Sequence, residues 1–424
     1  MSKNKGYFVS PIILFMGVLT MFELCVRLPY VLYVRFSPEL GYTISLHFFS
    51  AHSPDAVIFI GLTILLVTAG MCLFLAIKSG LFYKVQNLKI PRLHFPWIIY
   101  PIALIFIGAA FLSIILLGVT NVLDNLSGKR SEAGESFLLY ICVKMANFCH
   151  VIAIIFYVKN LQKSSLIDRG LFLLATIALI LPTIVFSQRA ILIGFALELL
   201  YIQMIFKVFN LRGIMRIVLT IIPVLLIISF LRPGNSAADF TFLEALAASL
   251  EKVVSSRYFF DFTKLGTVTL WFMETPWLGP VSLNFLVEPF FPDSVYFYKE
   301  IGPIISDEAY HYRTKNGVTP GALMEGILSF GILGGILFFG LLFFFFIKTE
   351  RRLLMKKKTI STFEFFLMLL ILSKFSLLVN SSLGAFVFQT VLEAAFLSAV
   401  FMMIGFWKMI TGTQIKPMRR ASGL

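Results

Sequence analysis

The chain has 424 residues, of which 58% are hydrophobic and 14% are charged. A soluble globular protein carries about 25% charged residues, so this composition excludes an ordinary water-soluble domain and is typical of repeated bilayer spans. The formal net charge is +14, but the basic residues lie between apolar runs, where they orient helices. We therefore expect no nucleic acid as a partner.

Ten apolar runs are long enough to cross a bilayer, which requires about 20 mostly apolar residues. They predict an all-α polytopic membrane protein with about ten transmembrane helices. Residues 1–231 hold seven spans, 232–319 form one large loop, and 320–424 hold three spans and a tail. The runs cover residues 8–26, 55–77, 96–118, 137–158, 170–187, 190–209, 213–231, 320–347, 361–379 and 385–407.

The basic residues predict the orientation of these spans. With both termini on the inner side, 22 of the 36 lysines and arginines lie in inner segments and 12 in outer segments. Seven of those 12 belong to the long loop, and long loops count little in the positive-inside rule. The bias therefore predicts cytoplasmic termini and places the 232–319 loop on the outer side.

The 232–319 loop mixes acidic and basic residues and carries its own structure. Apolar residues between Phe240 and Val254 recur at helical spacing, which predicts an amphipathic helix on the membrane surface. Aromatic residues follow from Trp271 to Tyr298. They indicate either an aromatic belt at the lipid interface or a stacking surface for sugar rings.

Charged residues inside spans are costly and are usually functional or paired. At 1.5 Å per residue, six charged residues in the spans or at their outer ends lie within about 15 Å of the predicted outer surface. This asymmetry predicts a polar cavity that opens outward, although Lys374 and Glu393 are also expected to pair across the last helical hairpin for structural reasons alone. The six are Lys144, Arg189, Glu198, Glu325, Lys374 and Glu393.

Arginine binds pyrophosphate well because its planar guanidinium makes two parallel charge-assisted hydrogen bonds. The predicted outer face offers Arg189, Arg232, Arg257 and Arg313 as ligands. Arg189 also fits a simpler role, as a residue that extends its charged end to the interface.

Four residues near the start of the eighth span are candidates for a catalytic base. They are Glu325, Asp307, Glu308 and His311, whose side chains can accept a proton. The four cysteines lie in or beside apolar runs and are expected to be buried thiols, so we expect no metal site and no cofactor.

Two motifs resemble the O-antigen polymerase and ligase superfamily. Ser187-Gln188-Arg189-Ala190 is similar to the entry to a span in those proteins. The run from Thr319-Pro320-Gly321 through Glu325-Gly326 to Phe330-Gly331-Ile332-Leu333-Gly334 resembles the helix after the large periplasmic loop of Wzy-type oligosaccharide repeat-unit polymerases. The sequence departs from the pattern around the acid, which reads Met-Glu-Gly, and lacks a loop element described for some members.

The resemblance implies a GT-C-like fold in the bacterial inner membrane. It implies a metal-independent glycosyltransferase that moves a glycan from undecaprenyl pyrophosphate to a sugar hydroxyl of the next lipid-linked repeat unit, on the periplasmic side. The implied partners are that lipid-linked oligosaccharide, membrane lipid and a chain-length regulator protein. Arginines would neutralise the leaving pyrophosphate, and a carboxylate or histidine would accept the hydroxyl proton.

Three other functions remain open at this point. An O-antigen ligase would share the architecture and use a different acceptor. A flippase for the same lipid-linked unit is expected to have polar residues at mid-depth and on both sides, with internal repeat symmetry, and the sequence shows neither. A non-catalytic scaffold of an envelope complex would leave the charges inside the spans without a role.

Overall fold

The computed structural model describes residues 7–36, 52–80, 82–84, 97–118, 137–162, 165–185, 189–206, 261–274, 321–355, 361–380 and 383–410. In these residues the chain is almost entirely helical, and seven helices are long and apolar enough to cross a bilayer. Large apolar side chains such as Phe59, Ile115 and Leu333 are exposed on the outside of the bundle. A lipid environment accounts for such exposure, so the protein is an all-α polytopic membrane protein.

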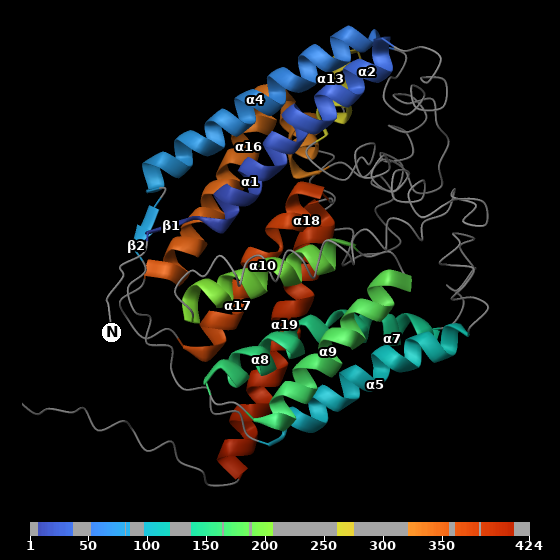
Figure 1. Ribbon diagram of the computed structural model, residues 1–424, viewed down its shortest axis with the longest axis vertical. Helices are drawn as coiled ribbons and strands as arrows, with labels where there is room; N and C mark the ends of the chain where they lie inside the picture. Colours follow the sequence, from blue (N-terminus) through green and yellow to red (C-terminus); the bar gives the residue numbers. More distant parts are fainter. Residues whose placement is uncertain are drawn as a thin grey trace, which may run out of the picture.

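The described helices pack in three groups (Figure 1). In the first, α13 and α16 lie against α4, beside the N-terminal helices. Its elements are α1 (Pro11–Phe22), the π-helical turn η1 (Glu23–Arg27), α2 (Leu28–Phe36), α4 (Pro54–Ser79), α13 (Phe262–Glu274) and α16 (Ala322–Met355). A short antiparallel pair, β1 (Tyr7–Val9) and β2 (Phe82–Lys84), joins the chain just before α1 to the chain just after α4.

The second group packs at the opposite side of the molecule, and the third lies between the other two (Figure 1). The second consists of α5 (Ile99–Leu117), α7 (Phe137–Asn147), α8 (Cys149–Gln162) and α9 (Leu166–Val185). The third consists of α10 (Arg189–Phe206), α17 (Thr362–Ser373), α18 (Phe375–Asn380) and α19 (Leu383–Ile410).

Nine of the ten predicted spans coincide with helices. Seven of these nine helices have the length and hydropathy expected of a membrane span. The sixth and ninth predicted spans correspond to the shorter apolar helices Ile191–Gln203 and Thr362–Ser373. The seventh predicted span, 213–231, and the predicted amphipathic helix 240–254 lie outside the described residues. The fourth span bends at Phe148, between α7 and α8.

One helix of the long loop, α13, belongs to the bundle itself. Its residues from Phe262 to Thr269 are all buried. A Cβ atom on Gly266 would lie 2.0 Å from the Val57 carbonyl oxygen, and one on Gly61 would lie 1.8 Å from the Phe262 carbonyl oxygen. Only glycine permits this approach of α13 to α4. The buried Trp271 therefore belongs to the core and not to the predicted aromatic surface.

The eighth predicted span is a broken helix. Gly331 has φ of 75° and ψ of 176°, which interrupts α16 between residues 322–330 and 332–355. A Cβ atom on Gly326 would lie 2.9 Å from the Gly335 Cα, whereas nine residues of straight helix would separate these positions by about 13.5 Å. The segment 322–330, here called the folded-back arm, therefore returns against the rest of α16.

The glycines of this helix have different roles on the two sides of the break. Gly326 and Gly335 face each other across the bend, and Gly331 provides the left-handed backbone conformation that makes the bend. Gly340 lies further along, where Met71 of α4 packs against it. One glycine thus forms the bend, and the others permit two close contacts, one between the two parts of α16 and one with α4.

Candidate functional site

Four ionisable side chains from four separate parts of the chain meet inside the bundle. They come from the start of α8, the middle of α10, the junction of α17 with α18, and α19. All are buried, with exposed fractions between 0% and 6%. We call them the buried charge cluster: His150, Glu198, Lys374 and Glu393.

The cluster is held together by short contacts. Lys374 Nζ lies 2.5 Å from Glu393 Oε1, which confirms the predicted pair across the last hairpin. His150 Nε2 lies 3.3 Å from Glu393 Oε2 and 3.8 Å from Glu198 Oε1. The predicted pair is therefore half of a larger arrangement that joins the second and third groups of helices.

The backbone brings these residues together through close packing of α10 on the end of α17. A Cβ atom on Gly194 would lie 3.4 Å from the Ser373 carbonyl oxygen, so α10 approaches closely one turn before Glu198. The Ser373 hydroxyl donates a hydrogen bond to the Leu370 carbonyl oxygen at 2.7 Å. Neither Glu198 carboxyl oxygen has a partner at hydrogen-bond distance and angle among the described residues.

Glu325 lies on the folded-back arm, one turn after the start of α16, as predicted. Its exposed fraction is 1%, and the Ser329 hydroxyl donates to its backbone carbonyl oxygen at 2.9 Å. The arm contacts α18, because a Cβ atom on Gly321 would lie 2.5 Å from the Val379 carbonyl oxygen. Since Lys374 immediately precedes α18, this short helix connects the arm to the buried charge cluster.

The structure brings together only some of the predicted site residues. Glu198, Lys374 and Glu393 form one cluster, and Glu325 lies on a neighbouring element. Arg189 is the first residue of α10, whose backbone alone is described there. The remaining predicted residues, Arg232, Arg257, Arg313, Asp307, Glu308 and His311, lie outside the described residues.

Sequence reasoning missed His150. A single histidine inside an apolar run carries little signal by itself. His150 lies 13 residues into the fourth predicted span, whereas Glu198 and Glu393 each lie eight residues into theirs, so predicted depth alone does not place the three together. The available signal is only that polar residues inside spans tend to be paired or functional.

A second buried ionic group ties the long loop to the first span. Arg27 Nη2 lies 2.8 Å from Asp261 Oδ2, and Arg27 Nη1 lies 3.4 Å from Glu23 Oε1. Asp261 also caps α13, since its Oδ1 accepts hydrogen bonds from the Thr263 hydroxyl at 2.6 Å and the Thr263 amide at 2.9 Å. This group anchors α13 and accounts for the burial of Arg27.

A third polar group joins α1, α10 and α16. The Tyr201 hydroxyl donates to Glu350 Oε1 at 2.8 Å, and the Ser10 hydroxyl donates to Glu350 Oε2. Glu350 is fully buried. Both carboxyl oxygens have partners, so this group serves packing.

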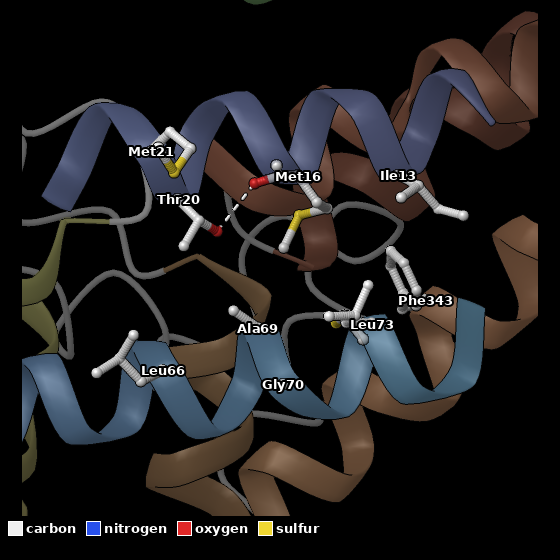
Figure 2. A pocket seen from close by; sticks show the side chains of 11 residues that line it. Ile13, Met16, Thr20, Met21, Leu66, Ala69, Gly70, Leu73 and Phe343 are labelled. Atoms are coloured by element: carbon white, nitrogen blue, oxygen red, sulfur yellow. Dashed lines mark hydrogen bonds between the residues drawn. The ribbon is translucent and has the colours of Figure 1, made fainter. Parts of the chain in front are cut away.

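An apolar pocket of about 300 Å³ lies between α1 and α4, with Phe343 of α16 at one end (Figure 2). Among the described residues that line it, Thr20 carries the one hydroxyl, which donates to the Met16 carbonyl oxygen at 2.9 Å. The lining therefore suits hydrocarbon and offers nothing to a sugar or a phosphate.

Within the described residues, no group of three or more His, Cys, Asp or Glu side chains is arranged to hold a metal ion.

Comparison with known proteins adds no relative: no family model, no curated protein and no solved structure matches the chain. The class of the protein therefore rests on its own sequence and geometry. These define a multi-pass helical membrane protein with a broken helix and a cluster of charges buried between its helices.

Proposed function

We propose that the protein is a polysaccharide polymerase of the bacterial inner membrane with a GT-C-like fold. It would transfer a glycan from undecaprenyl pyrophosphate to a sugar hydroxyl of the next lipid-linked repeat unit on the periplasmic side. In this reaction the bond from the anomeric carbon to the pyrophosphate oxygen breaks and a bond to the acceptor oxygen forms. The acceptor hydroxyl loses its proton, and the lipid pyrophosphate leaves.

The observation that carries the proposal is the folded-back arm with its buried acid. Broken helices inside membranes occur where they are buried in protein or line a cavity, and transporters and enzymes use them at substrate sites. Here the break falls at Gly331, inside the Phe-Gly-Ile-Leu-Gly run that resembles the polymerase motif. Glu325, the acid of the same motif, is buried on the arm.

The chemistry assigns a role to each predicted residue. Glu325 would accept the acceptor hydroxyl proton or orient that hydroxyl, with Asp307 and His311 as the other candidates for the base. Arg189, Arg232, Arg257 and Arg313 would bind and neutralise the pyrophosphate as it leaves. The arm follows the 232–319 loop directly, so residues of the loop reach the acid over a short stretch of chain.

The buried charge cluster favours a second candidate function, a flippase for the same lipid-linked oligosaccharide. Glu198 lies at the middle of α10 and Glu393 well inside α19, so polar residues occur at the mid-depth where a transporter needs them. An O-antigen ligase also remains compatible with the arm and its acid. The three functions differ in their products.

Surface polysaccharide from a deletion strain separates these functions. Loss of the polysaccharide ladder with retention of single-repeat species is the expected result for a polymerase. Loss of all repeat-bearing species would instead indicate a ligase or a flippase, and an unchanged ladder would exclude all three.

Complementation of the deletion strain with variants of the protein then tests the role of Glu325. Glu325→Gln should fail to restore the ladder, whereas Glu364→Gln, a control at the far end of the bundle where Glu364 pairs with Arg352 at 2.6 Å, should restore it. Membrane levels of both variants should match the wild type. A ladder restored by Glu325→Gln would assign Glu325 to helix structure alone.

A further inference from the structure

The hydrogen bonding of His150 fixes where its ring carries a proton. Its Nδ1 lies 2.5 Å from the Asn147 carbonyl oxygen. A carbonyl oxygen only accepts hydrogen bonds, so Nδ1 must be the donor and carry a proton. In a neutral ring the other nitrogen, Nε2, would then have a lone pair and no proton.

That lone pair would face two carboxyl groups. Nε2 lies 3.3 Å from Glu393 Oε2 and 3.8 Å from Glu198 Oε1. The Nε2 lone pair and the two carboxylate oxygens can all only accept hydrogen bonds, so they repel one another unless a proton lies between two of them. Either the ring is an imidazolium or one carboxyl group is protonated.

A count of the charges in the cluster also indicates one additional proton. The Lys374 ammonium and the Glu393 carboxylate cancel at 2.5 Å. Among the described side chains, Glu198, with an exposed fraction of 0%, is then one uncompensated negative charge inside the membrane, which is energetically costly. One additional proton, on His150 or on Glu198, makes the cluster neutral.

We propose that the buried charge cluster is a proton-binding site that holds one exchangeable proton, shared between His150 Nε2 and the Glu198 carboxyl group. Lys374 and Glu393 form the fixed pair beside it. The charged groups that face His150 from α10, α19 and the α17–α18 junction are Glu198, Glu393 and Lys374. Among the described side chains, the next charge along α8 is Lys159, nine residues further on, which pairs with Asp168 of α9.

The site also has a mechanical consequence. His150 belongs to the second group of helices, and its partners belong to the third. Loss of the proton would leave a net negative charge between the two groups and weaken the attraction of α8 for α10 and α19. This inference does not depend on the proposed transferase reaction, because it follows from the cluster alone.

The test uses the full-length protein in lipid nanodiscs with ¹⁵N-labelled histidine. The chain has five histidines, and the signal lost in His150→Gln identifies this one. At neutral pH we expect either an imidazolium signal for His150 or a protonated-carboxyl infrared band that Glu198→Gln removes. A neutral His150 together with no such band would overturn the proposal.

Two further variants check the charge count. Glu198→Gln leaves the Lys374–Glu393 pair balanced, and Glu393→Gln leaves Lys374 balanced by Glu198, so each should lose the additional proton and show a neutral His150. If one variant fails to fold, the other answers the same question. Asp168→Asn, in α9 beside Lys159 at the C-terminal end of α8, should leave the His150 signal unchanged. An imidazolium that persists in a folded Glu198→Gln or Glu393→Gln variant would contradict the shared-proton site.

Discussion

The two ends of α8 hold buried charges in different ways. Near its C-terminal end, Lys159 Nζ lies 2.8 Å from Asp168 Oδ1, and the Tyr100 hydroxyl donates to the same oxygen at 3.0 Å. That group is balanced by one positive and one negative charge. Near its N-terminal end, His150 faces two carboxyl groups and one lysine, which balance only when a further proton is bound.

This difference distinguishes charged groups that stabilise the packing from charged groups that we expect to have a function. A balanced group with satisfied hydrogen bonds needs nothing from solvent and fixes how α5, α8 and α9 pack. The buried charge cluster costs free energy in every state that lacks the additional proton. Because polar groups inside membranes are generally functional, we expect the buried charge cluster to have a function.

The largest effect is expected from Lys374→Met. The change leaves Glu393 and Glu198 as two buried carboxyl groups with one histidine, and removal of one partner of a buried pair costs about 3–5 kcal/mol. Thermal melting in detergent should show the loss. The double variant Lys374→Met with Glu393→Gln should recover most of it, because the charges balance again, and an additive loss would contradict the charge count.

A smaller effect is expected from Lys159→Met. Asp168 is buried, but it keeps the Tyr100 hydroxyl, and the Lys159 side chain is 17% exposed near the end of a span. Loss of a hydrogen bond to a charged group costs about 1.5–3 kcal/mol. Melting under the same conditions measures the change. If Lys159→Met proves more destabilising than Lys374→Met, the contrast between the two ends of α8 fails.

Tyr100→Phe should cost less again. It removes the hydrogen bond to Asp168 and the one accepted from Lys159, and leaves the ion pair between those two residues in place. Because Asp168 keeps its cation, we expect a loss near the lower end of the about 1.5–3 kcal/mol that a hydrogen bond to a charged group contributes. The variant also keeps the ring over which the Lys159 ammonium lies, 4.3 Å from its centroid. A loss as large as that of Lys159→Met would mean that the hydroxyl is the main partner of Asp168.

Glu198→Gln should have the smallest effect on stability at neutral pH. The amide has the same size, and the cluster becomes neutral without an additional proton. We expect a melting temperature equal to or above that of the wild type. Strong destabilisation would show that the Glu198 carboxylate is itself a structural partner of His150.

The helices could be predicted from the sequence because apolar runs of about 20 residues have few alternatives in a membrane. Glu198, Lys374, Glu393 and Glu325 were recognised for a related reason, since charges inside such runs stand out. The pair between Lys374 and Glu393 followed from their depths on adjacent spans.

Other features needed three-dimensional information. The bend at Gly331 was missed because five glycines on one helix also fit a close-packed face. Helix α13 was missed because Thr263, Lys264, Thr267 and Thr269 give it a polar sequence although all four are buried. Its signals were Asp261 as a capping residue and the apolar spacing of Leu265 and Val268, which distant contacts with α4 convert into a buried helix.

The most direct measurement of the proposed function uses purified protein and polyprenyl-pyrophosphate-linked repeat units. The wild type should produce glycans longer than one repeat unit, and Glu325→Gln should produce none while its melting temperature is unchanged. Substrate left at a single repeat length by folded wild-type protein, or chains of normal length made by Glu325→Gln, would contradict the account.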